Sequence, residues 1–90
     1  MMDITFSPEA EEDYNYWKEN NLKTVDRIKR LLNDMSKYPF SGIGKPEKLK
    51  YELSGKWSRR INSIHRIVYI VNESENDIYV LALRYHYKKK

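Results

Sequence analysis

The 90-residue chain contains no cysteine, only three glycines and three prolines, and no long apolar run. Without cysteine the protein can have neither a disulfide nor a thiol nucleophile, and a zinc site built on cysteine is excluded. No apolar stretch approaches the roughly 18 residues of a membrane helix, and no charged start leads into an apolar run with a cleavage site. We therefore expect a cytoplasmic protein that does not contact a membrane.

Aromatic and charged side chains are what the sequence has in abundance. Aromatic residues make up 13% of the chain and hydrophobic residues 40%, which is enough for the core of one domain over residues 1–90. Residues 1–36 carry a net charge of −3, whereas residues 37–90 carry +7 and end in a basic tail, Lys88–Lys90. A polyanionic partner would therefore bind mainly through the second part of the chain.

The spacing of apolar residues predicts a short strand followed by two helices. Residues 3–6 alternate as in a strand, and Ser7–Pro8 is typical of a helix start. Apolar residues three and four positions apart predict a second helix from Leu22 onward. The pair Tyr38–Pro39 ends it, because the residue before a proline is pushed out of the helical conformation.

Three strand-like runs follow a glycine-containing loop at residues 41–46. They cover residues 56–61, 65–71 and 78–87, separated by polar turns. Neighbouring runs joined by short turns pair as antiparallel hairpins. We therefore predict an α+β fold, in which two N-terminal antiparallel helices pack on one face of a small, mainly antiparallel, twisted β-sheet.

Strand alternation places basic residues on otherwise apolar faces. Arg66 shares its face with two apolar residues, and Arg84 and His86 end an apolar face of the last run. Antiparallel pairing brings Arg66 and His86 within a side chain's length of one another, and the register decides whether they share a face. Taken singly, such residues are most often solvated at the rim of a sheet, and a lysine tail is usually solvated as well.

Taken together, the polar residues are the parts needed for metal-free cleavage of RNA. The 2′-hydroxyl must lose a proton as it attacks phosphorus and the 5′-oxygen must gain one, so Glu47 and His86 can divide the acid–base work. Arg66 can stabilise the charge on the phosphate oxygens. Neither a metal nor a cofactor is expected, because the two histidines are far apart in sequence. The remaining candidates are a phenol, Tyr87, and the phosphate-binding cations Lys50, Arg59, Arg60 and Arg84.

Five motifs stand in order along the second part of the chain: GKPEKLK, LSG, WSRRI, HRIVY and RYHY, at residues 44–50, 53–55, 57–61, 65–69 and 84–87. In order and spacing they resemble the YoeB (Txe/YoeB) toxins, within the wider RelE group. The resemblance covers essentially the whole chain. It implies a RelE-like, microbial ribonuclease-like fold and a toxin of a type II toxin–antitoxin pair.

The resemblance also implies an mRNA endoribonuclease that cuts transcripts in the ribosomal A site and stops translation. It implies that Glu47 is the general base, His86 the general acid and Arg66 the group that stabilises the pentacoordinate phosphate. Lys50 and Arg60 would hold backbone phosphate, and Tyr87 would aid orientation. The products would be a 2′,3′-cyclic phosphate or 3′-phosphate and a free 5′-hydroxyl.

The implied partners are the 70S ribosome, mRNA and a YefM-like antitoxin whose disordered acidic segment folds over the toxin. The toxin–antitoxin complex would repress its own operon, with DNA contacted mainly by the antitoxin. Toxins of this family can pair as homodimers. They commonly end near the tyrosine that matches Tyr87, and we expect the additional Lys88–Lys90 tail to attract phosphate.

Two other functions fit the same composition. A ParE-like toxin would act on DNA gyrase without being a nuclease, and a basic module could bind RNA or the ribosome without chemistry. The acid–base set argues against the gyrase inhibitor, because a binder does not need a carboxylate, an imidazole and a guanidinium together.

Overall fold

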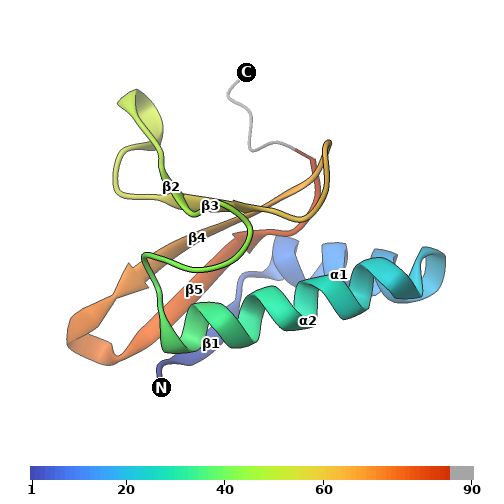
Figure 1. Ribbon diagram of the computed structural model, residues 1–90, viewed down its shortest axis with the longest axis horizontal. Coiled ribbons are helices and arrows are strands. Elements are labelled where there is room, and N and C mark those ends of the chain that lie inside the picture. The colour runs from blue at the N-terminus through green and yellow to red at the C-terminus, as the bar shows by residue number, and fades with distance from the viewer. Residues whose placement is uncertain (86–90) are drawn as a thin grey trace.

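The computed structural model describes residues 1–85 and has five strands in one sheet with two helices on one side of it (Figure 1). The helices are α1 Pro8–Asn20 and α2 Leu22–Lys37. The strands are β1 Asp3–Phe6, β2 Glu47–Lys48, β3 Trp57–Arg60, β4 Arg66–Asn72 and β5 Asp77–Ala82, with short 3-10 turns η1 Tyr51–Leu53 and η2 Glu73–Glu75. The predicted α+β fold is confirmed.

Both helices start at capping side chains. The hydroxyl oxygen of Ser7 accepts a hydrogen bond from the backbone N–H of Ala10 at 3.0 Å, as predicted for the start of α1. Asn21 ends α1 and begins α2: its N–H donates to the Trp17 carbonyl, and its side-chain oxygen accepts from the N–H of Thr24. Because one residue joins the helices, they fold back on each other as an antiparallel pair.

The sheet has the strand order β1-β5-β4-β3-β2. Strands β3 to β5 form the predicted antiparallel meander, and the two-residue strand β2, which the sequence pattern does not indicate, pairs antiparallel with β3. β1 pairs in parallel with β5, with Ile4 opposite Ile78, so the first strand completes the sheet beside the last one. The sheet is therefore mixed, with its one parallel pair at an edge.

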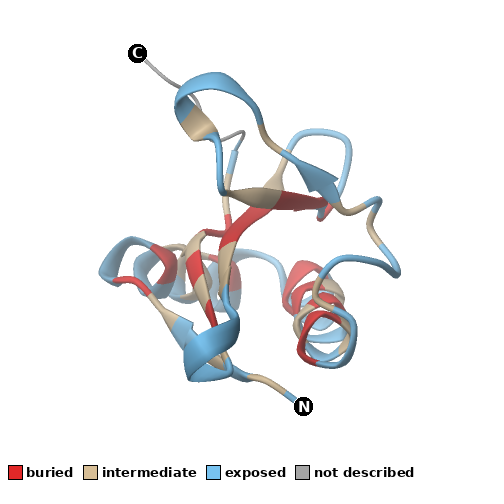
Figure 2. Ribbon diagram, turned by 90° about the vertical axis from the view of Figure 1, so that its left-hand side faces the viewer, coloured by how far each residue is buried: buried red, intermediate tan, exposed pale blue. Residues whose placement is uncertain are grey.

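The core lies between the helices and the side of the sheet that they cover, as the buried residues in Figure 2 show. β4 contributes Ile67 and Tyr69 to it, and β5 contributes Ile78 and Val80. The helices contribute Ala10, Trp17, Val25, Ile28, Leu31 and Met35. The opposite face of the sheet carries no helix in the described part of the chain.

β5 ends at Ala82, so residues 83–85 lie outside the strand predicted over residues 78–87, and β5 does not keep a simple alternation. Val68 lies opposite Ala82 and Tyr69 lies opposite Val80, so Leu81 is one extra residue in β5. Such a β-bulge moves the following side chain to the other face. Ala82 therefore lies on the helix-free face, whereas uninterrupted alternation in this strand would place it on the same face as Ile78 and Val80.

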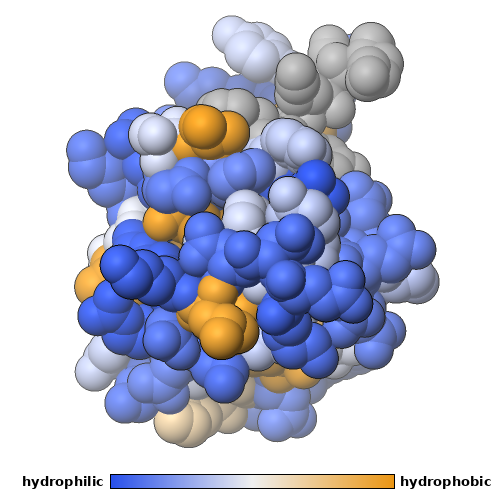
Figure 3. Space-filling view, turned by 90° about the vertical axis from the view of Figure 1, so that its right-hand side faces the viewer, coloured by the Kyte–Doolittle hydropathy of each residue, from blue (hydrophilic) through white to orange (hydrophobic). Residues whose placement is uncertain are grey.

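The surface in Figure 3 is mainly hydrophilic, with separate small apolar areas instead of one continuous patch. Within residues 1–85, neither helix is long and apolar enough to cross a membrane.

Replacing Gly42 by alanine should lower the free energy of unfolding by more than about 1 kcal/mol. Gly42 has a φ of +114°, and an added Cβ would lie 1.9 Å from a carboxylate oxygen of Asp34. Gly55 offers a matched control, because its φ is +91° and an added Cβ would meet nothing within 4 Å. Urea unfolding of both alanine variants separates the contact from the backbone conformation, and equal effects would contradict the role of the contact.

Candidate functional site

Glu47, Arg60 and Arg66 share the helix-free face of the sheet. Residues directly opposite each other in an antiparallel pair point to the same side, as do residues two apart in one strand. Glu47 lies opposite Ser58, and Arg60 lies opposite Arg66. The three side chains therefore emerge together, from β2, β3 and the start of β4.

The two arginines concentrate positive charge at this place. Side chains directly opposite each other have Cβ atoms about 4.5–5.5 Å apart, and like charges there are unfavourable. Neither Arg60 nor Arg66 forms an ion pair with another described residue, since the ion pair of this part of the chain joins Arg59 to Asp34. A bound anion would relieve the repulsion between the two guanidinium groups.

Backbone contacts hold both arginines in place. The Arg66 Nη1 atom donates to the carbonyls of Asn62 at 3.2 Å and of His65 at 3.3 Å, which orients its half-buried guanidinium. Arg27 on α2 donates to the backbone carbonyl of Arg60 at 3.1 Å, so the end of β3 is tied to the helix while the Arg60 side chain stays exposed. Lys50 is also exposed and lies just before η1, in the connection from β2 to β3.

Side chains of α1 take the place of sheet hydrogen bonds after β5 ends. A carboxylate oxygen of Asp13 accepts from the N–H of Leu83, and the indole N–H of Trp17 donates to the Leu83 carbonyl, both at 2.9 Å. Burial raises the pKa of the Asp13 carboxyl and outweighs the hydrogen bond from Leu83 and the positive charge of Arg84. Sequence reasoning missed Asp13 as a residue that holds this segment.

Residue 85 is held in the same way from the turn before β4. The N–H of Tyr85 donates to Nδ1 of His65 at 2.7 Å, and its carbonyl accepts from the N–H of Arg66 at 3.1 Å. The predicted site residues His86 and Tyr87 follow directly and lie outside the described residues, as does the Lys88–Lys90 tail. The structure thus brings the start of the RYHY motif beside Arg66.

Arg84 lies against aromatic rings at the same end of the sheet. The centre of its guanidinium is 3.5 Å from the ring centroid of Tyr16 and 4.7 Å from that of Tyr85. Its Nη2 atom donates to the Tyr85 hydroxyl at 3.0 Å. Stacked in this way Arg84 is half-buried, and a role in binding phosphate remains a prediction.

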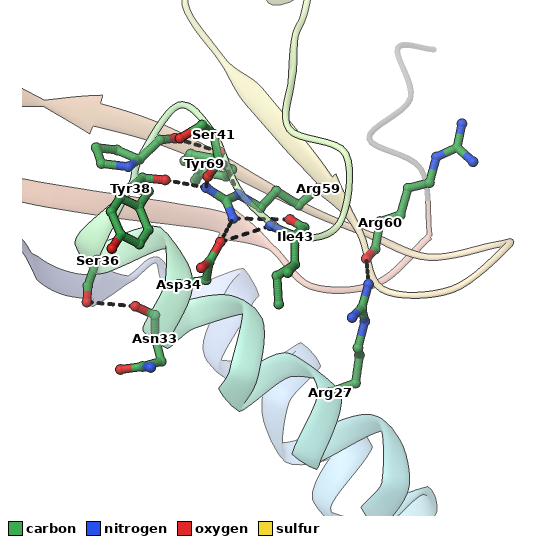
Figure 4. A network of polar contacts seen from close by, with 11 residues as sticks. Arg27, Asn33, Asp34, Ser36, Tyr38, Ser41, Ile43, Arg59, Arg60 and Tyr69 are labelled. Atoms are coloured by element: carbon green, nitrogen blue, oxygen red, sulfur yellow. Dashed lines mark hydrogen bonds and ion pairs between the residues drawn. The ribbon is translucent and has the colours of Figure 1, made fainter.

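Arg59 is the site residue that sequence analysis placed wrongly. It lies opposite Ile67 on the helix side of β3 and has no exposed surface. Its five N–H groups all donate within the protein (Figure 4). The acceptors are the Asp34 carboxylate, the Tyr69 hydroxyl and the carbonyls of Tyr38, Ser41 and Ile43. The prediction that Arg59 binds RNA phosphate is wrong, because no donor is left for a ligand.

The pKa values of the two side chains that pair with Arg59 shift in opposite directions. For Asp34, burial would raise the pKa, but the hydrogen bonds from Arg59 and from the N–H of Ile43 outweigh it, and the pKa lies below its ordinary value of 3.8. For Tyr69, burial raises the pKa above 10.0, so the phenol stays protonated and donates to the Pro39 carbonyl at 2.9 Å.

The lowered pKa of Asp34 predicts a loss of stability in acid. A carboxyl group with a lower pKa in the folded state stabilises the fold above its unfolded pKa, and this contribution disappears as the pH falls through the folded pKa. The free energy of unfolding should therefore drop below about pH 4. Urea unfolding across this pH range should show a flatter curve for Asp34→Asn, and parallel curves for the two proteins would contradict the prediction.

No three histidine, aspartate or glutamate side chains within residues 1–85 are grouped as metal ligands. What the described residues offer is an exposed carboxylate on the same face of the sheet as two guanidinium groups that have no carboxylate partner within residues 1–85.

Comparison with known proteins gives the family. Residues 6–87 match the family described as the YoeB-like toxin of bacterial type II toxin–antitoxin systems. Toxin RelK of Mycobacterium tuberculosis is 48% identical over 87 residues, which cover 97% of this chain and 100% of that protein. A Staphylococcus aureus YoeB–YefM complex contains a chain with 49% identity and a TM-score of 0.85, covering 97% of this chain and 99% of that one. A YoeB dimer from the same organism matches with 48% identity and a TM-score of 0.86, covering 96% and 98%. This chain belongs to the YoeB-like toxin family of type II toxin–antitoxin systems.

Proposed function

We propose that this toxin is a ribosome-dependent mRNA endoribonuclease that cuts mRNA in the ribosomal A site. The observation that carries the proposal is the position of Glu47, Arg60 and Arg66 on one helix-free face, where neither arginine has a carboxylate partner among residues 1–85. A base beside two cations is what attack of a 2′-hydroxyl on the adjacent phosphodiester requires.

The chemical steps follow from the side chains. Glu47 takes the proton of the 2′-hydroxyl, and His86 gives a proton to the leaving 5′-oxygen, each contributing about 10² to 10⁴ in rate. Arg66 neutralises the charge that develops on the pentacoordinate phosphate. Lys50 and Arg60 hold neighbouring phosphates, Tyr87 orients the substrate and Arg84 is a further phosphate contact. The reaction uses no metal or cofactor.

The same proposal names the partners. One relative is described in complex with YefM and another as a YoeB dimer. We expect this chain to bind a YefM-like antitoxin, whose acidic segment would be attracted to the basic second part of the toxin, and to be able to form a homodimer. It would meet the 70S ribosome and mRNA in the cytoplasm, and it would reach DNA only through the antitoxin complex.

The test is cleavage of a defined mRNA on programmed 70S ribosomes. The purified toxin should generate new 5′-hydroxyl ends at the A-site codon, which a kinase can label without prior phosphatase treatment. The same mRNA without ribosomes should be cut far more slowly, since the ribosome holds the substrate. Intact mRNA under conditions in which a family member of established activity cuts it would refute the proposal.

Induction in cells separates the other candidate functions. An early loss of protein synthesis supports the ribonuclease, whereas an early loss of DNA synthesis would identify a ParE-like gyrase inhibitor. Ribosome binding without new 5′-hydroxyl ends would identify a non-catalytic RNA- or ribosome-binding module.

A further inference from the structure

We propose that Arg59 is a positioning residue for Glu47. On the helix side of β3 its guanidinium binds the backbone of the 38–44 loop, and this fixes the position of the Glu47 carboxylate on the helix-free side of the sheet. The inference rests on the proposed role of Glu47 as the general base. Arg59 itself does not touch the substrate, because it is buried and all its donors are used.

The 38–44 loop connects α2 to β2 and contains no helix or strand. Its backbone carbonyls therefore need other partners. The Arg59 guanidinium supplies them: Nη2 donates to the carbonyls of Tyr38 and Ser41 at 2.5 and 2.7 Å, and Nη1 donates to that of Ile43 at 3.1 Å. Figure 4 shows the loop wrapped around this one side chain.

Two further side chains fix the guanidinium and the loop to each other. One carboxylate oxygen of Asp34 accepts from Arg59 at 2.7 Å and from the N–H of Ile43 at 2.9 Å. The Tyr69 hydroxyl accepts from Nε of Arg59 at 3.1 Å and donates to the Pro39 carbonyl. The loop is thus tied at once to α2, β3 and β4.

The end of the loop closes directly onto β3. A Cβ on Gly44 would lie 2.7 Å from a methyl group of Leu31 and 3.3 Å from Cβ of Arg59, so only glycine allows this approach. The Gly44 carbonyl accepts from the N–H of Arg60 at 2.7 Å. Only two residues then separate Gly44 from Glu47, and one of them is a proline with a fixed φ.

Because the two residues between Gly44 and Glu47 form a short, stiff connection, a shift of the loop would also shift Glu47. Glu47 pairs with Ser58, the residue before Arg59, and lies on the opposite face from the Arg59 guanidinium. If the loop were released, β2, which is only two residues long, would keep its register only through its short ladder with β3 and the hydrogen bond from the N–H of Leu49 to the Lys56 carbonyl. Misplacement of a catalytic group by about 1 Å can cost about 10²-fold in rate.

The arrangement needs arginine and not merely a positive charge. Arginine has five donors in a rigid planar fork, whereas lysine has three donors on one atom. Lysine at position 59 can pair with Asp34 but cannot reach three carbonyls and the Tyr69 hydroxyl together. Arg59→Lys should therefore keep the charge and release the loop.

The test is a double-mutant cycle on programmed ribosomes, with kcat and KM for cleavage measured for Arg59→Lys, Glu47→Gln and the double variant. Circular dichroism should first establish a temperature at which each variant is folded. We expect Arg59→Lys to lower kcat by about 10- to 100-fold and to change KM by less than about 3-fold, because Arg66 and Lys50 are untouched. In the Glu47→Gln background the same substitution should change kcat by less than about 2-fold.

The outcomes separate the inference from the proposed function. If Glu47→Gln cuts mRNA like the wild type, the proposed role of Glu47 fails. If Glu47→Gln is impaired and Arg59→Lys lowers kcat by the same factor with and without it, Glu47 is catalytic but Arg59 does not act through it. That result would overturn the inference alone.

Tyr69→Phe serves as the second variant, for use also if Arg59→Lys does not fold. It removes the hydroxyl that bonds Arg59 and Pro39 and keeps the ring in the core. Ile28→Val, in the core of α2, is the control for loss of stability. Tyr69→Phe should lower kcat while Ile28→Val leaves it unchanged, and equal losses would overturn the inference.

Discussion

Replacing Arg66 by alanine is expected to lower the rate of mRNA cleavage by about 10²- to 10³-fold. In the proposed mechanism the attacked phosphate gains negative charge in the transition state, and Arg66, which shares the helix-free face with Glu47 and Arg60, would neutralise that charge. Two turn carbonyls already orient its guanidinium, so the group needs little rearrangement when the charge develops. Single-turnover cleavage on programmed ribosomes measures the effect.

Two neighbouring variants serve as controls for this result. Arg66→Lys should recover only part of the rate, because lysine keeps the charge but cannot fork onto two phosphate oxygens. Arg60→Ala should act mainly on KM and on its salt dependence, as expected for a group that holds backbone phosphate. If Arg66→Ala retains the wild-type rate, or loses the fold together with the activity, Arg66 is a structural residue and not a catalytic one.

Arg59→Met is expected to lower the free energy of unfolding by about 3–5 kcal/mol. The substitution leaves the Asp34 carboxylate and three backbone carbonyls without their shared donor. Unsatisfied groups of this kind cost more than the hydrogen bonds themselves contribute. Urea denaturation of the purified proteins gives the difference directly.

The adjacent arginine provides a matched control. Arg60→Met changes the same atoms at an exposed position and should alter the free energy of unfolding by no more than about 0.5 kcal/mol. If both substitutions destabilised the protein equally, the buried network around Arg59 would not be the cause.

Arg59 and Arg60 show which feature could not be predicted from the sequence, namely the side of β3 on which each arginine lies. Sequence analysis assigned both to RNA, since buried arginine is rare and the pattern of β3 alone does not say which side faces the helices. The register of β3 with β4 decides which arginine faces the helices, because it places Arg59 opposite Ile67 and Arg60 opposite Arg66. Alternation does predict that Arg66 shares a face with two apolar residues of its strand, but the packing of the helices decides which face stays uncovered.

The helices and most of the strands could be predicted because the residues that indicate them lie within or next to each segment. Apolar spacing indicates the helices, and Ser7 and the Tyr38–Pro39 pair mark where they begin and end. The bulge at Leu81 and the bonds from Asp13 and Trp17 to Leu83 join segments far apart in sequence. Their positions depend on packing, so the end of β5 could not be predicted from its own residues.

The parallel pairing of β1 with β5 sets the order in which this protein can acquire its structure. Of the strands in residues 1–85, β1 is synthesised first, yet its partner β5 is synthesised last, and the Ser7 hydroxyl bonds a carbonyl 74 positions further along the chain. Contacts of such long range are slow to form and cannot form at all on a partial chain. During translation the sheet therefore stays incomplete until β5 has emerged, and the face that carries Glu47, Arg60 and Arg66 belongs to a complete sheet only from that point on.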